Sequence, residues 1–153
     1  ETAVAGLPAG IGEPFFDSVE STLAHLLFSV PAVKGVEFGA GFGFAGMKGS
    51  EANDPLRLED GHITTATNHN GGVNGGVANG MPLVLRSCVK PTPSIYKPQR
   101  TVDLASGAEG ELRIQGRHDP CILHRAAVVQ TAAVCIGLLD LCTQRFGTLW
   151  QAE

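Results

Sequence analysis

The sequence predicts an α+β fold with mainly antiparallel sheet. A chain of 153 residues, of which 43% are hydrophobic and 17% charged, is sufficient for one globular domain with a core. Helical and strand-like patterns occur in mixed order, and glycine-containing turns rather than regular β-α-β crossovers join the strand-like segments. We therefore expect a single domain over residues 1–153, with 1–14 as a loop lead-in and 146–153 as a tail.

The first predicted helix follows the lead-in. Asp17 is a good helix-capping residue, and Glu20, three residues later, can close a capping box with it. Pro31 cannot continue a helix, so we expect the helix to end there. Five apolar residues fall on one face at helical spacing: Val19, Leu23, Leu26, Leu27 and Val30.

Short apolar alternation broken by glycine follows the helix. Residues 33–47 alternate in this way on both sides of Gly39, Ala40 and Gly41, which predicts two strands joined by a turn. The glycines resemble a nucleotide-binding loop only weakly, because no helical pattern follows them. Residues 48–62 are polar and indicate an exposed excursion.

Residues 64–80 are rich in glycine, with the sequence TTATNHNGGVNGGVANG. Glycine permits positive φ angles and a close approach of the backbone to a ligand. The interleaved valines, and the strand predicted over 82–89, favour a loop pinned against the core over a floppy one. Farther along, residues 101–104 and 111–114 predict a hairpin around the turn ASGAEG.

The last predicted element is a helix from residue 125 to about residue 144. Between Arg125 and Asp140 its only polar side chains are those of Gln130 and Thr131. A helix that is apolar nearly all round has to be buried on nearly all sides. We judge it too short to span a membrane, and we expect it to pack between two layers or at a subunit contact.

Composition argues against several classes of function. The net charge of −4 disfavours a surface that binds nucleic acid or an anionic membrane. The four cysteines form no CxxC pair and have no matching histidine spacing, so we predict neither a metal site nor disulfides. No targeting segment is evident, which favours a soluble, cytoplasmic protein. Residues 86–125 nevertheless contain seven basic and four acidic residues, which suits either a small anionic ligand or a solvated surface.

Two segments display side chains suited to chemistry. Residues 90–94, KPTPS, form a turn stiffened by two prolines that bears an ammonium and two hydroxyls, a reasonable way to hold a phosphate. Residues 116–121, GRHDPC, present Arg117, His118 and Asp119 from a constrained backbone, a plausible site for anion binding and proton transfer. A proline-rich turn and a cluster of surface charges are the plain alternatives. A hydrolase using His118 and Asp119 is another, without a recognisable nucleophile.

Three long motifs, in order, resemble those of the C-terminal half of chorismate synthase. They begin with AGLPAGIGEPFFDSVESTLAHLLFSVPAVKGVEFGAGF, continue with NGGVNGGVANGMPLVLRSCVKPTPSIYKPQRTVD, and end with GRHDPC followed by an apolar helix. The resemblance covers about residues 5–142. It implies that the chain is part of a β-α-β sandwich, in which helices lie between antiparallel sheets, within a homotetramer.

The resemblance also implies a reaction: the anti 1,4-elimination of phosphate from 5-enolpyruvylshikimate-3-phosphate to give chorismate, the last common step of aromatic amino-acid biosynthesis in the shikimate pathway. Reduced FMN is the implied cofactor, and whether NADPH or a separate reductase reduces it is open. The family chain is more than twice this length, and its N-terminal half supplies active-site histidines and most substrate-binding arginines. We therefore expect the isolated chain to lack turnover. A non-catalytic flavin-binding or assembly module of the same fold is the alternative.

The same motifs imply which residues form the site. Arg117 resembles a residue that lies close to both flavin and substrate. Asp119 resembles a carboxylate near flavin N5, where a proton is exchanged, and it is the implied catalytic residue. The implied cofactor-binding residues are Pro31, Ala32, Gly75, Lys90, Pro91, Thr92, Pro93, Ser94 and Arg117.

Overall fold

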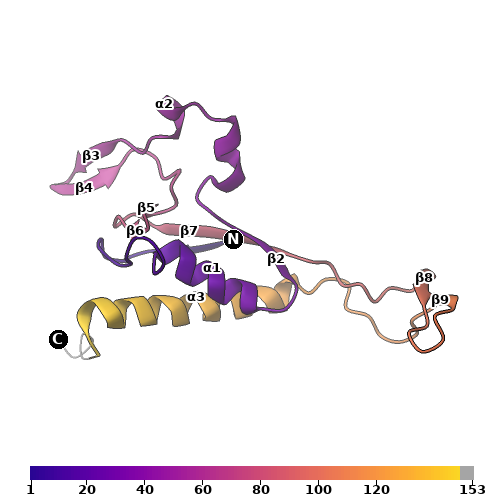
Figure 1. Ribbon diagram of the computed structural model, residues 1–153. Helices are drawn as coiled ribbons and strands as arrows, with labels where there is room; N and C mark the ends of the chain where they lie inside the picture. Colours follow the sequence, from indigo (N-terminus) through magenta and orange to yellow (C-terminus); the bar gives the residue numbers. More distant parts are fainter. Residues whose placement is uncertain (149–153) are drawn as a thin grey trace.

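A computed structural model describes residues 1–148 of the chain. Every strand pair in these residues is antiparallel, so the predicted α+β class with antiparallel sheet is confirmed. The elements are β1 (Thr2–Val4), α1 (Val19–Ser29), β2 (Val33–Phe38), a 3-10 helix (Gly41–Gly46), α2 (Gly49–Ala52), β3 (Leu56–Glu59), β4 (His62–Thr65), β5 (Val73–Asn74), β6 (Val77–Ala78), β7 (Leu83–Val89), β8 (Gln99–Val102), β9 (Glu109–Leu112) and α3 (Leu123–Phe146) (Figure 1).

The core lies between a three-stranded sheet and two helices. The strand order is β1-β7-β2, so β7 has a neighbour on both sides. Its alternate residues Leu83 and Leu85 are fully buried, as expected for the face of a strand that is turned toward a core. Helices α1 and α3 run along the sheet and contact each other (Figure 1). Their buried side chains complete one cluster with the strands, including Leu23, Leu27, Val134 and Leu138.

The N-cap of helix α1 lies one residue later than predicted. The Ser18 hydroxyl accepts a hydrogen bond from the Ser21 amide at 3.0 Å, so Ser18 and not Asp17 is the N-cap. Asp17 lies outside the helix, where its carbonyl accepts from the Glu13 amide. The predicted end is confirmed, because the helix stops at Ser29, two residues before Pro31.

The predicted second strand within 33–47 is wrong. After β2 the chain forms the 3-10 helix Gly41–Gly46, and β2 pairs with β7 instead. Gly39 and Gly41 both have positive φ angles, and the Glu37 carboxylate accepts from the Phe42 amide at 3.0 Å. These features end the extended backbone. The excursion at 48–62 is largely exposed as predicted, although it enters the β3–β4 hairpin.

The two ends of the chain differ from the predicted lead-in and tail. Strand β1 pairs with β7, and Ile11 is fully buried, so residues 1–14 are part of the folded body. Helix α3 continues to Phe146. Of the predicted tail, residues 149–153 lie outside the described residues.

Burial of α3 on nearly all sides is not found within this chain, and its predicted cover by a second layer or at a subunit contact stays a prediction. Only one stripe is buried, made of Gln130, Val134, Gly137, Leu138, Leu141 and Cys142. The opposite face exposes large apolar side chains, among them Val128 at 71% and Ile136 at 62%. The prediction assumed that apolar character on every side implies cover on every side. The described residues supply a sheet and α1 on one side of the helix and no layer on the other.

Helix α3 is longer than the sequence pattern indicated. Its 24 residues are enough, by length and composition alone, to cross a membrane, which the expectation of a shorter helix overlooked. Its buried stripe carries one polar residue, Gln130, whose amide nitrogen donates to the Thr2 hydroxyl at 2.9 Å. The Ser87 hydroxyl donates to the Gln130 side-chain oxygen. Gln130 thus ties α3 to β1 and β7, as in a helix packed on a sheet.

Candidate functional site

The candidate site begins where β2 starts and β7 ends. The Lys90 amide donates to the Ala32 carbonyl at 2.7 Å, which fixes residues 90–94 beside the segment that follows α1. Ala32 has a φ of 72°, a left-handed conformation uncommon for alanine. Such backbone strain is concentrated at functional sites in proteins. The structure therefore brings Pro31 and Ala32 to the start of the KPTPS segment.

Residues 90–94 leave β7 as an extended and largely exposed segment. The Gln99 side-chain amide donates to the Pro93 carbonyl at 3.1 Å and braces the turn. The Thr92 hydroxyl oxygen is buried and has no hydrogen-bond partner in the structure. Buried hydroxyls are nearly always paired, so an unpaired one in a candidate binding segment indicates a place for a polar ligand atom.

After the β8–β9 hairpin the chain returns through residues 113–121, the return segment. Its residues Gly116 and His118 contact Tyr96 of residues 90–98, the outgoing segment between β7 and β8. The Tyr96 hydroxyl donates to the Gly116 carbonyl at 2.5 Å. The Tyr96 and His118 rings meet edge to face, with their centroids 4.6 Å apart. Sequence reasoning missed Tyr96, because only the fold places it across from a residue twenty positions later. Arg117 lies between the two contacted residues and is exposed.

Asp119 lies at the end of this return segment, near the start of α3. Its carboxylate oxygen Oδ2 is 3.0 Å from Arg125 Nη1, and both side chains are substantially exposed. The ion pair joins the GRHDPC segment to the helix. The carboxylate is thus held close to the candidate segment and is open to solvent.

The positive charges of this region separate into two sets. Arg86, Arg113 and Arg125 form ion pairs with Glu37, Glu111 and Asp119. In the described part of the chain, the other four basic residues between 86 and 125 have no ion-pair partner: Lys90, Lys97, Arg100 and Arg117. Lys90 and Lys97 lie on the outgoing segment, Arg100 lies on β8, and Arg117 lies on the return segment. This charge is available to an anion.

Gly75 lies at a different place from the other implied cofactor residues. It occupies the β5–β6 turn, where the neighbouring Gly76 carbonyl accepts from the Val19 amide at the start of α1. Pro31 follows the end of the same helix. An 11-residue helix is about 16 Å long, so Gly75 and residues 31–32 are separated by roughly that length. The assignment of Gly75 stays a prediction.

The glycine-rich loop is pinned to the core, as the sequence predicted. Val73 and Ala78 are each only 4% exposed. Asp54, which sequence reasoning missed, holds the loop from outside: its carboxylate accepts from the His69 amide at 2.8 Å and from the Asn70 amide at 2.9 Å. No local pattern marks Asp54, because its partners lie more than ten residues away.

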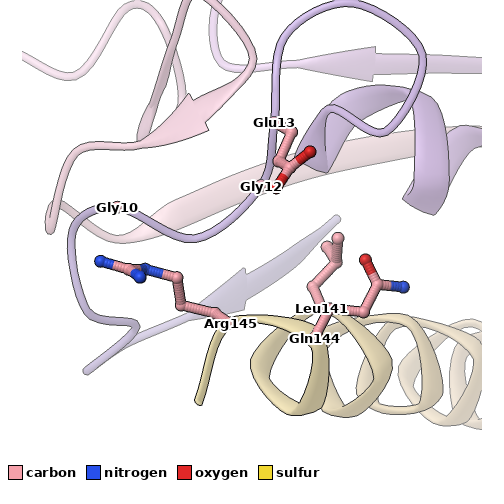
Figure 2. Close-up of a pocket in the computed structure, with 6 residues that line it drawn as sticks. All are labelled: Gly10, Gly12, Glu13, Leu141, Gln144 and Arg145. Carbon is pink, nitrogen blue, oxygen red and sulfur yellow. The ribbon is translucent and has the colours of Figure 1, made fainter. Parts of the chain in front are cut away.

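A cavity of about 260 Å³ lies away from this region, between the lead-in and the last turns of α3. Figure 2 shows Glu13 on one wall, with Leu141, Gln144 and Arg145 on the helical wall. It contains none of the implied site residues. Since Asp119 pairs with Arg125 near the opposite end of α3, this cavity and the candidate segments are separate places.

Comparison with known proteins gives consistent matches. A family model described as chorismate synthase matches residues 1–143. The chain is 53% identical to the chorismate synthase of Thermococcus gammatolerans over 145 residues, which are 95% of this chain and 41% of the relative. It is 55% identical to that of Chitinophaga pinensis over 140 residues, 92% of this chain and 42% of the relative.

A solved structure agrees with these relatives. A crystal structure of chorismate synthase matches with a TM-score of 0.75 and 27% sequence identity, covering 95% of this chain and 37% of that one. The chain spans about two fifths of the length of the curated relatives it matches. Since the family model covers nearly all of the chain, and the fold agrees with it, the chain belongs to the chorismate synthase family.

Proposed function

We propose that this chain forms a flavin- and phosphate-binding wall of a chorismate synthase active site. The proposed reaction is the elimination of phosphate from 5-enolpyruvylshikimate-3-phosphate to give chorismate, a step of the shikimate pathway. We propose that the protein carries it out as a soluble, cytoplasmic enzyme. Two observations support the proposal: the Lys90 amide donates to the Ala32 carbonyl, and Tyr96, two residues after Ser94, contacts Gly116 and His118. The unpaired basic residues there supply the charge that a phosphorylated ligand needs.

The residues present fit FMN. The buried Thr92 hydroxyl lacks a partner, and it can donate to a phosphate or ring oxygen. Lys90 is exposed and, within the described residues, forms no ion pair, so its ammonium is available to a phosphate. Pro91 and Pro93 fix the backbone between these groups, which lowers the entropy lost on binding. Ser94 ends this segment, and Pro31 and Ala32 lie beside its start. Gly75 would contact only a ligand that extends toward the start of α1.

Arg117 and Asp119 have distinct proposed roles. The Arg117 guanidinium presents a planar set of donors, which suits the phosphate of 5-enolpyruvylshikimate-3-phosphate or of FMN. Reduced FMN, when bound, supplies an electron-rich ring beside the substrate, although the elimination has no net redox change. Asp119 would serve as a proton donor and acceptor beside a bound flavin, and Arg125 holds its carboxylate in place. Flavin reduction by NADPH or by a separate reductase fits this arrangement equally well.

We expect the isolated chain to bind ligand without turnover. The family's active-site histidines and most of its substrate-binding arginines have no counterpart among the motifs matched here. The exposed apolar face of α3 is suited to a further layer of a β-α-β sandwich in a homotetramer. Robust phosphate release by this chain alone would contradict the assignment of those missing groups.

A second candidate is a non-catalytic assembly module. The exposed side chains of Val128, Ile136 and Leu139 on α3 favour it, because large apolar patches mark contact surfaces. Sedimentation of the purified chain distinguishes the candidates when it is combined with flavin binding. A chain that associates but binds no flavin supports assembly alone, and a chain that stays monomeric counts against an assembly role.

The test is a titration of the purified chain with FMN in the presence of 5-enolpyruvylshikimate-3-phosphate, followed by flavin fluorescence. We expect saturable binding that depends on the phosphate ester. Arg117→Ala should weaken it about tenfold, as for loss of a charged hydrogen bond. Arg57→Ala, on the exposed β3 strand, is the matched control and should bind like the parent chain. Equal affinities for both variants would contradict the assignment of Arg117.

Thr92→Val tests the segment independently of charge. It removes the unpaired hydroxyl and keeps the shape of the side chain. Because no hydrogen bond is lost in the free chain, its thermal stability should be equal to or above that of the parent, while FMN affinity falls several-fold. Unchanged affinity would remove Thr92 from the proposed site.

A further inference from the structure

We propose that Tyr96 is a positioning residue for the proposed flavin site, and that it acts by restraining the backbone on both sides of Arg117. The inference rests on the proposed function. It is carried by two contacts on either side of Arg117: the Tyr96 hydroxyl donates to the Gly116 carbonyl at 2.5 Å, and the Tyr96 ring meets the His118 ring edge to face at 4.6 Å. A residue whose two neighbours are both held by one side chain has little freedom of backbone direction.

The position of Tyr96 in the chain matters as much as its contacts. It lies two residues after Ser94, the last residue of the KPTPS segment. A side chain just after the KPTPS segment therefore restrains the backbone of the GRHDPC segment. Among the described residues, this is the hydrogen bond that joins the outgoing residues 90–98 to the return residues 113–121. The other restraints join Pro93 to Gln99 at the start of β8, join His118 to Ile114 within the return residues, or join Asp119 to α3.

The exposure of Tyr96 separates this role from an ordinary role in the core. Its side chain is 70% exposed, and it belongs to no buried cluster. Removing it should thus change the global stability of the fold little. Holding Arg117 in its bound position before the ligand arrives lowers the ordering cost of binding, so removal should weaken ligand affinity instead.

A double-mutant cycle on FMN binding tests the inference, using the full 153-residue chain with 5-enolpyruvylshikimate-3-phosphate present. Tyr96→Ala should raise the dissociation constant about tenfold, and Tyr96→Phe, which keeps the ring contact, only about threefold. In an Arg117→Ala background, Tyr96→Ala should have an effect of less than about twofold, because its target is gone. Leu104→Ala, at the fully exposed hairpin tip, is the control and should bind like the parent.

Amide order parameters provide a readout that does not need the ligand. In Tyr96→Ala the amides of Gly116, Arg117 and His118 should become more mobile on the nanosecond timescale, while the melting temperature stays within about 1 °C of the parent. Tyr96→Phe should restore most of the lost order. Unchanged order parameters in Tyr96→Ala would overturn the inference, whatever the flavin titration shows.

Different experimental outcomes distinguish a failure of this inference from a failure of the proposed function. Additive effects of Tyr96→Ala and Arg117→Ala would overturn positioning through Arg117 and leave the flavin site standing. If Arg117→Ala binds FMN like the parent, or the parent binds none, the proposed site fails. The order parameters then still decide whether Tyr96 holds the return segment.

Discussion

The two ends of strand β7 are built in opposite ways. At the Leu83 end, the strand meets the glycine-rich loop, where a Cβ added at Gly71 or Gly72 would lie less than 3.0 Å from backbone atoms. At the Val89 end, the strand runs into the proline-stiffened segment 90–94 and then into the projecting β8–β9 hairpin, whose strands are largely exposed (Figure 1). We call the first the packed end and the second the open end.

The difference shows how one strand serves two purposes. At the packed end, backbone amides and carbonyls satisfy each other, as where the Gly39 amide donates to the Val84 carbonyl and the Val84 amide donates to the Gly71 carbonyl. At the open end, polar groups such as the Thr92 hydroxyl and the Lys90 ammonium are left without protein partners in the described residues. Stability therefore comes mainly from the packed end, while ligand-binding capacity lies at the open end.

The largest expected effect on stability comes from adding a single methyl group at Gly71, at the packed end. A Cβ at Gly71 would lie 2.4 Å from the Gly39 nitrogen and 2.7 Å from the Val84 oxygen, and the residue has a φ of 63°. Gly71→Ala should lower the free energy of unfolding by about 4 kcal/mol, from left-handed strain plus overlap with rigid backbone. Urea denaturation measures the loss.

Gly75→Ala is the matched control for this substitution. Gly75 has a similar φ of 58°, but nothing lies within 4 Å of its added Cβ. It should cost only about 1 kcal/mol, the strain alone. Equal losses for the two variants would mean that overlap with the backbone at Gly71 adds nothing to the left-handed strain.

The next effect compares the core with the open end. Leu23 is fully buried between α1 and α3, whereas Leu104 is 99% exposed in the β8–β9 turn. Leu23→Ala should destabilise the chain by about 3 kcal/mol through lost burial and a residual cavity. Leu104→Ala should change stability by less than about 0.5 kcal/mol. A large loss for Leu104→Ala in the purified chain would show that the hairpin packs on a surface, such as that of a second copy.

Much of the fold follows from local sequence patterns. The helix ended by Pro31, the strand over 82–89 and the hairpin that became β8–β9 all depend on residues close together in the chain. The errors have long-range causes. The predicted second strand of 33–47 fails because β7, from fifty residues later, takes the place beside β2. The apolar composition of α3 did not show that only one of its faces is buried within this chain, because composition cannot show which faces have neighbours.

The motifs point to candidate site residues, and their assignment stays a prediction, but the arrangement of these residues could not be predicted. The motifs identified residues 90–94 and 116–121, and the fold places 116–118 beside Tyr96. Neither Tyr96 nor the distance between Gly75 and Pro31 could be read from spacing, because both depend on the direction of β7 and α1. The role of Asp54 was not predicted for the same reason, because its hydrogen-bond partners come from a loop that only the fold brings near.

The smallest expected effect is a pH dependence that distinguishes the two ends. Partial burial alone would raise the pKa of the Asp54 carboxyl, but donors from the Asn70 amide, the Thr67 hydroxyl and the His69 amide lower that pKa below its ordinary 3.8. A carboxyl whose pKa is lower in the folded chain stabilises it above the unfolded value, and this contribution is lost as pH falls through the folded value. Asp54→Asn should therefore be less stable than the parent above about pH 5, with the difference shrinking toward pH 3.

Asp103 at the open end is the matched comparison. Its pKa is also lowered, by the Ser106 amide and hydroxyl and by the Ala105 amide, but these bonds lie within one exposed turn. Because that turn is remote from the core, Asp103→Asn should leave the global unfolding curve unchanged at every pH. It should speed hydrogen exchange only at the Ala105 and Ser106 amides. If Asp103→Asn instead lowers global stability above pH 5 as Asp54→Asn does, the hairpin unfolds together with the core, and the division between a packed end and an open end would have to be given up.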